Sequence, residues 1–280
     1  MSTRQTVLVT TATGKTGRRV AERLAGRGVD VRAGSRGGGA ANGGTLFDWE
    51  APATWGPALR GADAAYVAYY PDLAVPGAAD ALRAFGRLAA EAGVRRLVLL
   101  SGRGEPAAAQ AEQALREALG ERSELTVVRA AFFVQNFTEG LMADGVAGGR
   151  VAFPAGDTPE PFVDADDVAD VSVAALLEDR HAGRVYELTG PRLVPFAQAA
   201  AELGAAVGHE VAYVPVSRGE YAAELEAYGL PQSDADWVAE LFAELLDGRN
   251  ASVTDGVEQV LGREARDFAE VVKAAFTPVA

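Results

Sequence analysis

A glycine-containing turn near the start of the chain has the residue types and spacing that suit a bound phosphate group. The stretch VLVTTATGKTGRRV, residues 7–20, predicts a strand, a turn with Gly14 and Gly17, and the start of a helix. Gly14 would let the backbone approach a pyrophosphate, and Gly17 would let the helix pack close to the strand. The helix N-terminus would offer unpaired N–H groups and a partial positive charge. Since a Gly-x-x-Gly turn can also bind nothing, its position between strand and helix is what favours a dinucleotide site.

Thr11 stands where such a turn usually carries the first of three glycines. A β-branched residue resists positive φ, so we predict a negative φ at Thr11 and a hydroxyl that bonds the turn backbone. Lys15 places a cation at a helix start, where the helix dipole disfavours it. A bound anion would explain this lysine, and a solvated side chain is the alternative.

The end of the second predicted strand indicates which dinucleotide would bind. An NAD-type site expects an acidic residue there, whereas this chain has Ser35 and Arg36. Arg36 could grip a 2′-phosphate and stack on adenine, so we favour NADP(H) over NAD(H), with an exposed loop arginine as the alternative. Asp48 could orient the adenine amine or simply serve as a turn residue.

Polar and aromatic residues further along could line a substrate site. The candidates are Tyr69, Tyr70, Phe132, Phe133, Asn136 and Phe153. We expect about half of them to be core residues instead. Asn136 is polar within an apolar run, although it could cap a turn, and Ser101 could donate to a substrate oxygen or cap a helix. Ser101 and Asn136 are therefore the candidate catalytic residues.

The elements that must position these residues alternate along the first half of the chain. Strands are predicted at 6–10, 29–35, 45–48, 64–70, 96–101 and 125–129, and helices at 15–27, 75–92 and 106–119. This alternation predicts crossover units in an α/β fold, a Rossmann-type doubly wound parallel sheet. We assign residues 1–155 to a Rossmann domain and 156–280 to a smaller, mainly helical C-terminal substrate region. Within the latter, residues 163–188 are expected to pack back on the sheet.

Composition excludes several classes of function. A net charge of −13 argues against a nucleic-acid surface and disfavours anionic membranes. The chain has no cysteine, and its two histidines, His181 and His209, are distant in sequence. The acidic set Asp164, Asp166 and Asp167 is better explained by helix capping than by a divalent metal, so we expect no metal site. Without a long apolar run or a secretory signal, the protein is expected to be cytoplasmic, with an undetermined oligomeric state.

Six segments in order, VTTATGKTG, FDW, GVRRLVLLSG, RAAFFVQNF, PFVDADDVADV and YELTGP, resemble the NmrA-like group of atypical short-chain dehydrogenase/reductases. TGKTGRR and FFVQNF are similar to its ergot-alkaloid reductase branch (festuclavine and agroclavine dehydrogenases), and NAD(P)H:quinone reductases are relatives. The resemblance implies a Rossmann fold of strand order 3-2-1-4-5-6-7, a small C-terminal substrate region and usually NADP(H). Thr11 departs from the family's glycine.

The same resemblance implies roles for residues. Residues 13–17 would hold the pyrophosphate and Arg36 would face the 2′-phosphate. Residues 69–71 and 101–102 would flank the ribose and nicotinamide, and residues 131–133 would cover the nicotinamide. The cofactor set is therefore Thr11, Ala12, Thr13, Gly14, Lys15, Thr16, Gly17, Ser35, Arg36, Asp48, Tyr69, Tyr70, Ser101 and Phe132.

The proton-donating Tyr-x-x-x-Lys pair of the wider superfamily is missing. Lys15 follows Thr11 at that spacing, Lys273 follows Ala269, and these are the only lysines. Ordinary ketone reduction by that pair is therefore excluded. Hydride transfer to an iminium, a quinone or a similar conjugated small molecule needs less acid catalysis and is the leading hypothesis. A non-catalytic NADP-binding redox sensor with a protein partner and a non-redox isomerase or cyclase are the alternatives.

Overall fold

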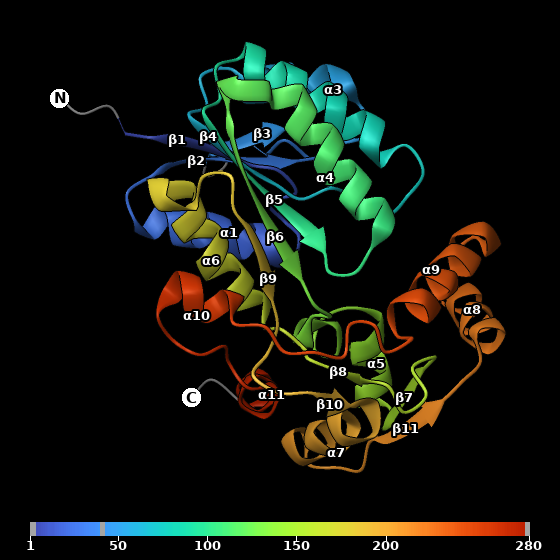
Figure 1. Cartoon of the computed structure of the whole chain (residues 1–280). Helices are drawn as coiled ribbons and strands as arrows, with labels where there is room; N and C mark the ends of the chain where they lie inside the picture. The colour runs from blue at the N-terminus through green and yellow to red at the C-terminus, as the bar shows by residue number, and fades with distance from the viewer. Residues whose placement is uncertain (1–3, 40–42, 278–280) are drawn as a thin grey trace. The chain divides into compact units, whose positions relative to one another are not determined.

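The computed structural model describes residues 4–39 and 43–277, and part of the expected loop at 36–44 therefore lies outside the described residues. This chain folds into two compact units, each of which it enters more than once (Figure 1). Unit 1 comprises Met1–Ala130, Ala165–Leu188 and Gly256–Arg263, less the undescribed positions. Unit 2 comprises Ala131–Asp164, Thr189–Asp255 and Glu264–Ala280, with the same restriction. The division at residue 155 stays a prediction of domains.

Unit 1 is built on a seven-stranded parallel sheet of order β3-β2-β1-β4-β5-β6-β9. The strands are β1 Thr6–Val9, β2 Asp30–Ser35, β3 Gly44–Leu46, β4 Ala64–Val67, β5 Arg96–Gly102, β6 Glu124–Ala130 and β9 Val185–Leu188. The helices are α1 Lys15–Gly26, α2 Trp55–Leu59, α3 Ala78–Glu91, α4 Pro106–Leu119, α6 Ala165–Leu177 and α10 Gly256–Leu261. The expected Rossmann-type sheet and strand order are confirmed, with β9 as the seventh strand.

Side chains alternate between the two faces of this sheet, as the period of a strand requires. Leu8, Val67 and Leu99 pack with Phe85 of α3 and Leu115 of α4 in one buried core. The helices α1 and α6 pack on each other, and α6 also contacts β4, β5 and β6 (Figure 1). Because both faces are covered, the central strands β1, β4, β5 and β6 are largely buried apolar runs, which makes them recognisable in the sequence.

Strand β4 ends earlier than the sequence predicted. The strand expected over 64–70 stops at Val67, and the helix expected from 75 begins at Ala78. The polar groups of Ala68 leave the ladder: its N–H donates to the Thr10 hydroxyl at 2.9 Å and its carbonyl accepts the Trp49 indole N–H at 2.9 Å. The chain at the carboxyl ends of β1 and β4 is thereby fixed by side chains instead of by sheet pairing.

Unit 2 combines short strands with helices around an aromatic core. Its elements are the 3-10 turn η4 Val134–Asn136, α5 Leu141–Ala147, β7 Arg150–Phe153, β8 Pro159–Glu160, β10 Val194–Pro195, α7 Phe196–Val207, β11 Ala212–Pro215, α8 Arg218–Ala227, α9 Gln232–Leu245 and α11 Phe268–Phe276. The sequence analysis missed these strands, because β7 pairs with β11 and β8 with β10 across long separations and each is short. Phe137, Phe153, Phe162 and Phe196 fill the core.

Candidate functional site

The β1–α1 turn corrects the prediction for Thr11. Its φ is +46°, not negative, and it is the one non-glycine residue with a positive φ in the described part of the chain. Three contacts fix this conformation: Gly14 N–H donates to the Thr11 carbonyl at 2.9 Å, Ala12 N–H donates to the Gly34 carbonyl at 2.8 Å, and Gly17 packs against the Thr11 carbonyl. Local preference is overridden because the surrounding backbone over-determines the turn.

The Thr11 hydroxyl was expected to bond the turn backbone. No hydrogen bond of this hydroxyl is found within the residues that the structure describes. The threonine therefore keeps the shape that a glycine would give the turn without compensating for its strain through its side chain.

Gly17 is the glycine of this turn at which a side chain would clash with the backbone. A Cβ at Gly17 would lie 2.2 Å from the Thr11 carbonyl oxygen, whereas a Cβ at Gly14 would lie 3.3 Å from the same atom. Gly14 is the N-cap of α1 with extended geometry, and no described side chain caps the first N–H groups of this helix, which has no acidic residue in its first turn. The donor set formed by these N–H groups and Lys15 fits a pyrophosphate, and its binding here stays a prediction.

Arg36 follows directly on β2, where an acid would stand in an NAD-type site. Its guanidinium carbon lies over the ring of Tyr70, 5.4 Å from the ring centroid. Tyr70 is 55% exposed, so the pair presents a cation on an open aromatic face. Two residues predicted from different strand ends are thus brought together. A guanidinium in this position fits a phosphate monoester and a purine ring.

Asp48 and Tyr69 have structural partners in unit 1. The Asp48 carboxylate accepts the Glu50 N–H at 3.1 Å, as a turn aspartate does, and its carbonyl accepts the Trp55 indole N–H at 2.7 Å. The Tyr69 ring packs on Trp49 with centroids 4.8 Å apart. Their proposed roles at the adenine and ribose stay predictions.

A partly buried network of charges, which the sequence analysis missed, joins the carboxyl ends of β5, β6 and β9. Ser101 donates its hydroxyl to Glu112 at 2.6 Å, and Glu112 is only 2% exposed. Arg129 donates twice to the same carboxylate, at 2.9 and 2.7 Å, and lies 3.6 Å from Glu187. Arg103 donates to Glu187 at 3.1 Å. The Ser101 hydroxyl is thus engaged by a carboxylate, and its role at a substrate stays a prediction.

A further carboxyl group lies at the same edge, in the loop between β5 and α4. The Glu105 carboxyl covers Gly102 so closely that a Cβ there would be 2.0 Å from its Oε1. Burial, together with the negative charges of Asp72 and Glu112, raises the pKa of Glu105 to about 8. The one available signal in the sequence was a glutamate beside a strand end, which is too common to be informative.

The aromatic candidates of unit 2 divide between core and partial exposure. Phe153 is completely buried and stacks on Phe196, with ring centroids 5.1 Å apart. Phe132 is only partly buried and contacts five phenylalanine rings, including those of Phe137 and Phe153. Phe153 is therefore a core residue, whereas the role of Phe132 at a nicotinamide stays a prediction.

Asn136 and Phe133 also belong to unit 2. Both side chains are partly exposed. The Asn136 N–H donates to the Phe133 carbonyl at 3.0 Å within the turn η4, and Phe133 forms a parallel bridge with Val163. The turn thus accounts for their backbone geometry, and their predicted contact with a substrate is untested.

The three aspartates around 164–167 are engaged by other side chains. Asp166 accepts hydrogen bonds from Arg19 and Arg23 in unit 1, and Asp167 accepts one from Arg263 at 2.7 Å. Burial opposes the effect, but the hydrogen bonds and charges of Arg23 and Arg19 hold the pKa of Asp166 below its usual value. In unit 2, Asp164 accepts from Gln135 at 2.6 Å. Among the described residues no cluster of His, Cys, Asp or Glu could hold a metal ion.

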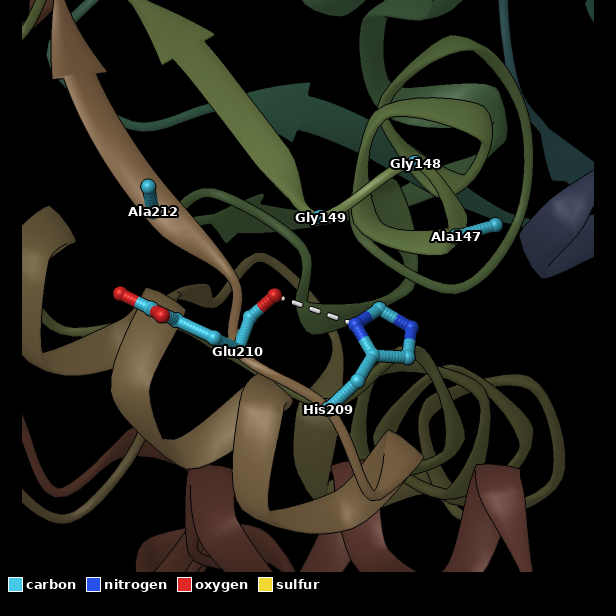
Figure 2. A pocket seen from close by; sticks show the side chains of 6 residues that line it. All are labelled: Ala147, Gly148, Gly149, His209, Glu210 and Ala212. Carbon is cyan, nitrogen blue, oxygen red and sulfur yellow. Dashed lines mark hydrogen bonds between the residues drawn. The ribbon is translucent and has the colours of Figure 1, made fainter.

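A surface hollow in unit 2 is separate from the predicted site residues. Figure 2 shows its lining, which consists of Ala147, Gly148, Gly149, His209, Glu210 and Ala212. The imidazole of His209 is 3.1 Å from the Glu210 carbonyl oxygen, the other lining residues are alanines and glycines, and none of the predicted site residues lines the hollow. We therefore place the candidate site at the strand ends of unit 1.

No family model matches this chain. It is 33% identical to YesF, an uncharacterised oxidoreductase of Bacillus subtilis, over 96% of this chain and 94% of YesF. It is 33% identical to the NAD(P)H azoreductase of Xenophilus azovorans, over 81% of this chain and 80% of that enzyme. Agroclavine dehydrogenase of Claviceps fusiformis is 28% identical, over 95% and 96%.

Solved structures share the fold. The NADPH complex of the quinone oxidoreductase QOR2 from Escherichia coli matches with a TM-score of 0.79 and 24% identity, over 97% of this chain and all of that one. The negative transcriptional regulator NmrA in complex with NADP matches with a TM-score of 0.72 and 20% identity, over 98% of this chain and 95% of NmrA. In the described residues, none of the helices has the length and apolar character to span a bilayer.

Proposed function

This chain belongs to the NmrA-like family of atypical short-chain dehydrogenase/reductases and is an NAD(P)H-dependent reductase. We propose that it prefers NADPH over NADH and reduces a conjugated small molecule. The acceptor class that we propose includes quinones, azo compounds and cyclic iminium ions. The names of the relatives support this range, since they include an azoreductase, a quinone oxidoreductase and agroclavine dehydrogenase.

The observation that carries the cofactor preference is the Arg36–Tyr70 pair, in which Arg36 directly follows β2. A guanidinium beside the ribose position would pair with a 2′-phosphate, which NADPH has and NADH lacks. The first N–H groups of α1, with Gly14 and Lys15, would hold the pyrophosphate. When bound, the reduced nicotinamide supplies a hydride, and the protein's part is to bind, orient and exclude water.

The acceptor class follows from the side chains that the chain lacks. Neither lysine stands four residues after a tyrosine, so the usual proton donor of the superfamily is missing. An iminium ion accepts a hydride without a proton, and a quinone or azo compound spreads the added charge over a conjugated system. These acceptors therefore require less acid catalysis than an isolated ketone.

The test follows NADPH oxidation with a panel of quinones, azo dyes and cyclic iminium ions, alongside calorimetric binding of NADPH and NADH. We expect turnover with at least one class. In Arg36→Ala, NADPH affinity should fall by about ten- to a hundredfold, the worth of a charge-assisted hydrogen bond, with NADH affinity nearly unchanged. Arg27→Ala, an exposed arginine at the end of α1, is the control and should behave as wild type. Tight NADPH binding without turnover across the panel would contradict the proposal and favour a sensor.

A further inference from the structure

The Glu105 side chain takes an unusual course for a residue at the start of a helix. Glu105 is the N-cap of α4, yet its side chain makes no capping hydrogen bond. Instead, the carboxyl group folds over Gly102, the last residue of β5. Any side chain at Gly102 would fill the space that the carboxyl group occupies. Since ligands of open α/β sheets bind at the carboxyl ends of the strands, Glu105 lies at the functional edge of unit 1.

Three carboxyl groups meet at this edge, and their hydrogen bonds distinguish them. Glu112 accepts the Ser101 hydroxyl and two N–H groups of Arg129. Asp72, in the loop after β4, accepts the Ala74 N–H at 2.7 Å. Glu112 thus has three donors and Asp72 has one, and burial raises the pKa of Asp72 despite that hydrogen bond. In contrast, Oε2 of Glu105 is buried and has no hydrogen-bond partner in the part of the chain that the structure describes.

In the described part of the chain, the two arginines at this edge are paired with carboxylates other than Glu105. Arg129, on β6, is paired with Glu112, and Arg103, at the end of β5, is paired with Glu187. The charges that act on Glu105 are those of Asp72 and Glu112, and with burial they raise the pKa of Glu105 to about 8. Of the three carboxyl groups, Glu105 is the one with a buried oxygen that lacks a donor among the described residues, which favours its protonated form.

We propose that Glu105 is a neutral carboxylic acid in the resting protein and is the proton donor that replaces the missing Tyr-x-x-x-Lys pair. This inference rests on the proposed function, because the proton is needed only if an acceptor is reduced. Asp72 and Glu112 are positioning residues in this scheme, since they act by keeping the proton on Glu105.

A quinone or azo acceptor gains a hydride from the reduced nicotinamide, which is thereby oxidised. The π bond of the acceptor opens, and the electron pair moves onto an oxygen or nitrogen atom. That atom takes the proton of Glu105, and the O–H bond of the carboxyl group breaks. The Glu105 carboxylate then regains a proton from water, which its partly exposed side chain can reach. A cyclic iminium ion needs no proton and serves as an internal control.

Infrared spectroscopy of the cofactor-free protein tests the protonation state without any turnover. At pH 7 ordinary carboxyl groups are ionised, so the C=O stretch of a protonated carboxyl group is diagnostic. We expect this band in wild type, its loss as the pH rises through about 8, and its absence in Glu105→Gln. Glu117→Gln, an exposed glutamate on the same helix, should retain it. In Asp72→Asn the band should disappear at lower pH. A wild type without the band, or a band that persists in Glu105→Gln, would overturn the assignment.

Turnover tests the donor role. In Glu105→Gln, kcat with a quinone or azo acceptor should fall by about a hundredfold, while NADPH affinity and kcat with a cyclic iminium ion stay near wild type. Wild-type turnover of the quinone should decline above about pH 8. Equal losses with both kinds of acceptor would refute the donor role. Failure of the wild type on every acceptor would refute the proposed function and the donor role with it, whereas the infrared band decides the state of Glu105 in either case.

Discussion

Two strand-to-helix turns of unit 1, β1–α1 and β5–α4, lie at the same edge of one sheet and are opposite in character. The first is rich in backbone donors: Gly14 precedes an uncapped helix start, and Lys15 adds a positive charge. The second collects carboxyl groups, with Glu105 over Gly102 and Glu112 behind Ser101. In each turn a glycine allows another group to approach the backbone closely. This group is the Thr11 carbonyl at Gly17 and the Glu105 carboxyl group at Gly102.

Two turns at one edge of a parallel sheet can thus favour different tasks, the binding of an anion and the retention of a proton. A helix start that no side chain caps favours an anion, which suits a pyrophosphate. A turn with crowded carboxyl groups favours a retained proton. Both turns hold a costly feature, a positive φ at Thr11 and a neutral carboxyl at Glu105. Substitutions that remove one feature at a time can therefore show which turn depends on stored strain and which on charge.

The largest effect should come from breaking the charge network of the β5–α4 side. Arg129→Met removes the cation that donates twice to Glu112 and leaves that carboxylate buried without its partner. We expect the free energy of unfolding to fall by about 3 to 4 kcal/mol, near the lower end of the cost of an orphaned buried charge because Arg129 is 30% exposed. Urea denaturation measures it.

Arg122→Met is the matched control for that experiment, because Arg122 is exposed. Its change should stay within about 0.5 kcal/mol. A double variant, Arg129→Met with Glu112→Gln, should recover part of the loss, since no buried charge is then left unpaired. Equal stabilities of Arg129→Met and Arg122→Met would show that the network contributes nothing.

The stability of the β1–α1 turn should depend on which of its two glycines receives a methyl group. Gly17→Ala places a Cβ 2.2 Å from a backbone carbonyl, so the helix must move, at a cost of about 2 to 3 kcal/mol. Gly14→Ala places its Cβ at 3.3 Å from the same oxygen and should cost about 1 kcal/mol or less. Thermal unfolding of both variants distinguishes them. Similar losses would mean that close packing at Gly17 is not what holds the turn.

The sequence predicted regular elements better than it predicted the contacts between them. The helix over 106–119 was placed correctly because Pro106 can begin a helix and Gly120 can end one. The Glu112–Arg129 pair joins two elements, and neither residue differs locally from an ordinary surface charge. The φ of Thr11 was predicted wrongly, because its contacts with Gly14 and Gly17 outweigh the preference of a threonine. The sequence pattern shows the propensity of a segment for helix or strand. The backbone strain at Thr11 and the pKa of Glu105 depend instead on residues that are brought near them by the tertiary fold.

A smaller effect should appear in the pH dependence of stability. The pKa of Glu105 is raised from 4.5 to about 8 on folding, so the folded state holds a proton that the unfolded state releases between these values. The free energy of unfolding should therefore fall as pH rises from about 4.5 to 8, relative to Glu105→Gln, and the difference should be constant above pH 8. We expect about 2 kcal/mol over this window, less than the full shift because Glu105 is partly exposed. Parallel curves for the two proteins in urea titrations would contradict a raised pKa.

The smallest effect concerns Thr11 itself. A positive φ costs a β-branched residue about 1 to 2 kcal/mol, and a glycine would remove that strain while adding about 0.5 to 1 kcal/mol of unfolded-state entropy. Thr11→Gly should therefore be neutral or stabilising by about 1 kcal/mol. Thr13→Gly, in the same turn without a positive φ, bears only the entropic cost and should destabilise. If both variants lose the same stability in urea, the strain at Thr11 is negligible. If Thr11→Gly gains stability but weakens NADPH binding, the threonine is kept for the cofactor, and the strain of the β1–α1 turn serves binding just as the crowded carboxyls of the β5–α4 turn serve proton transfer.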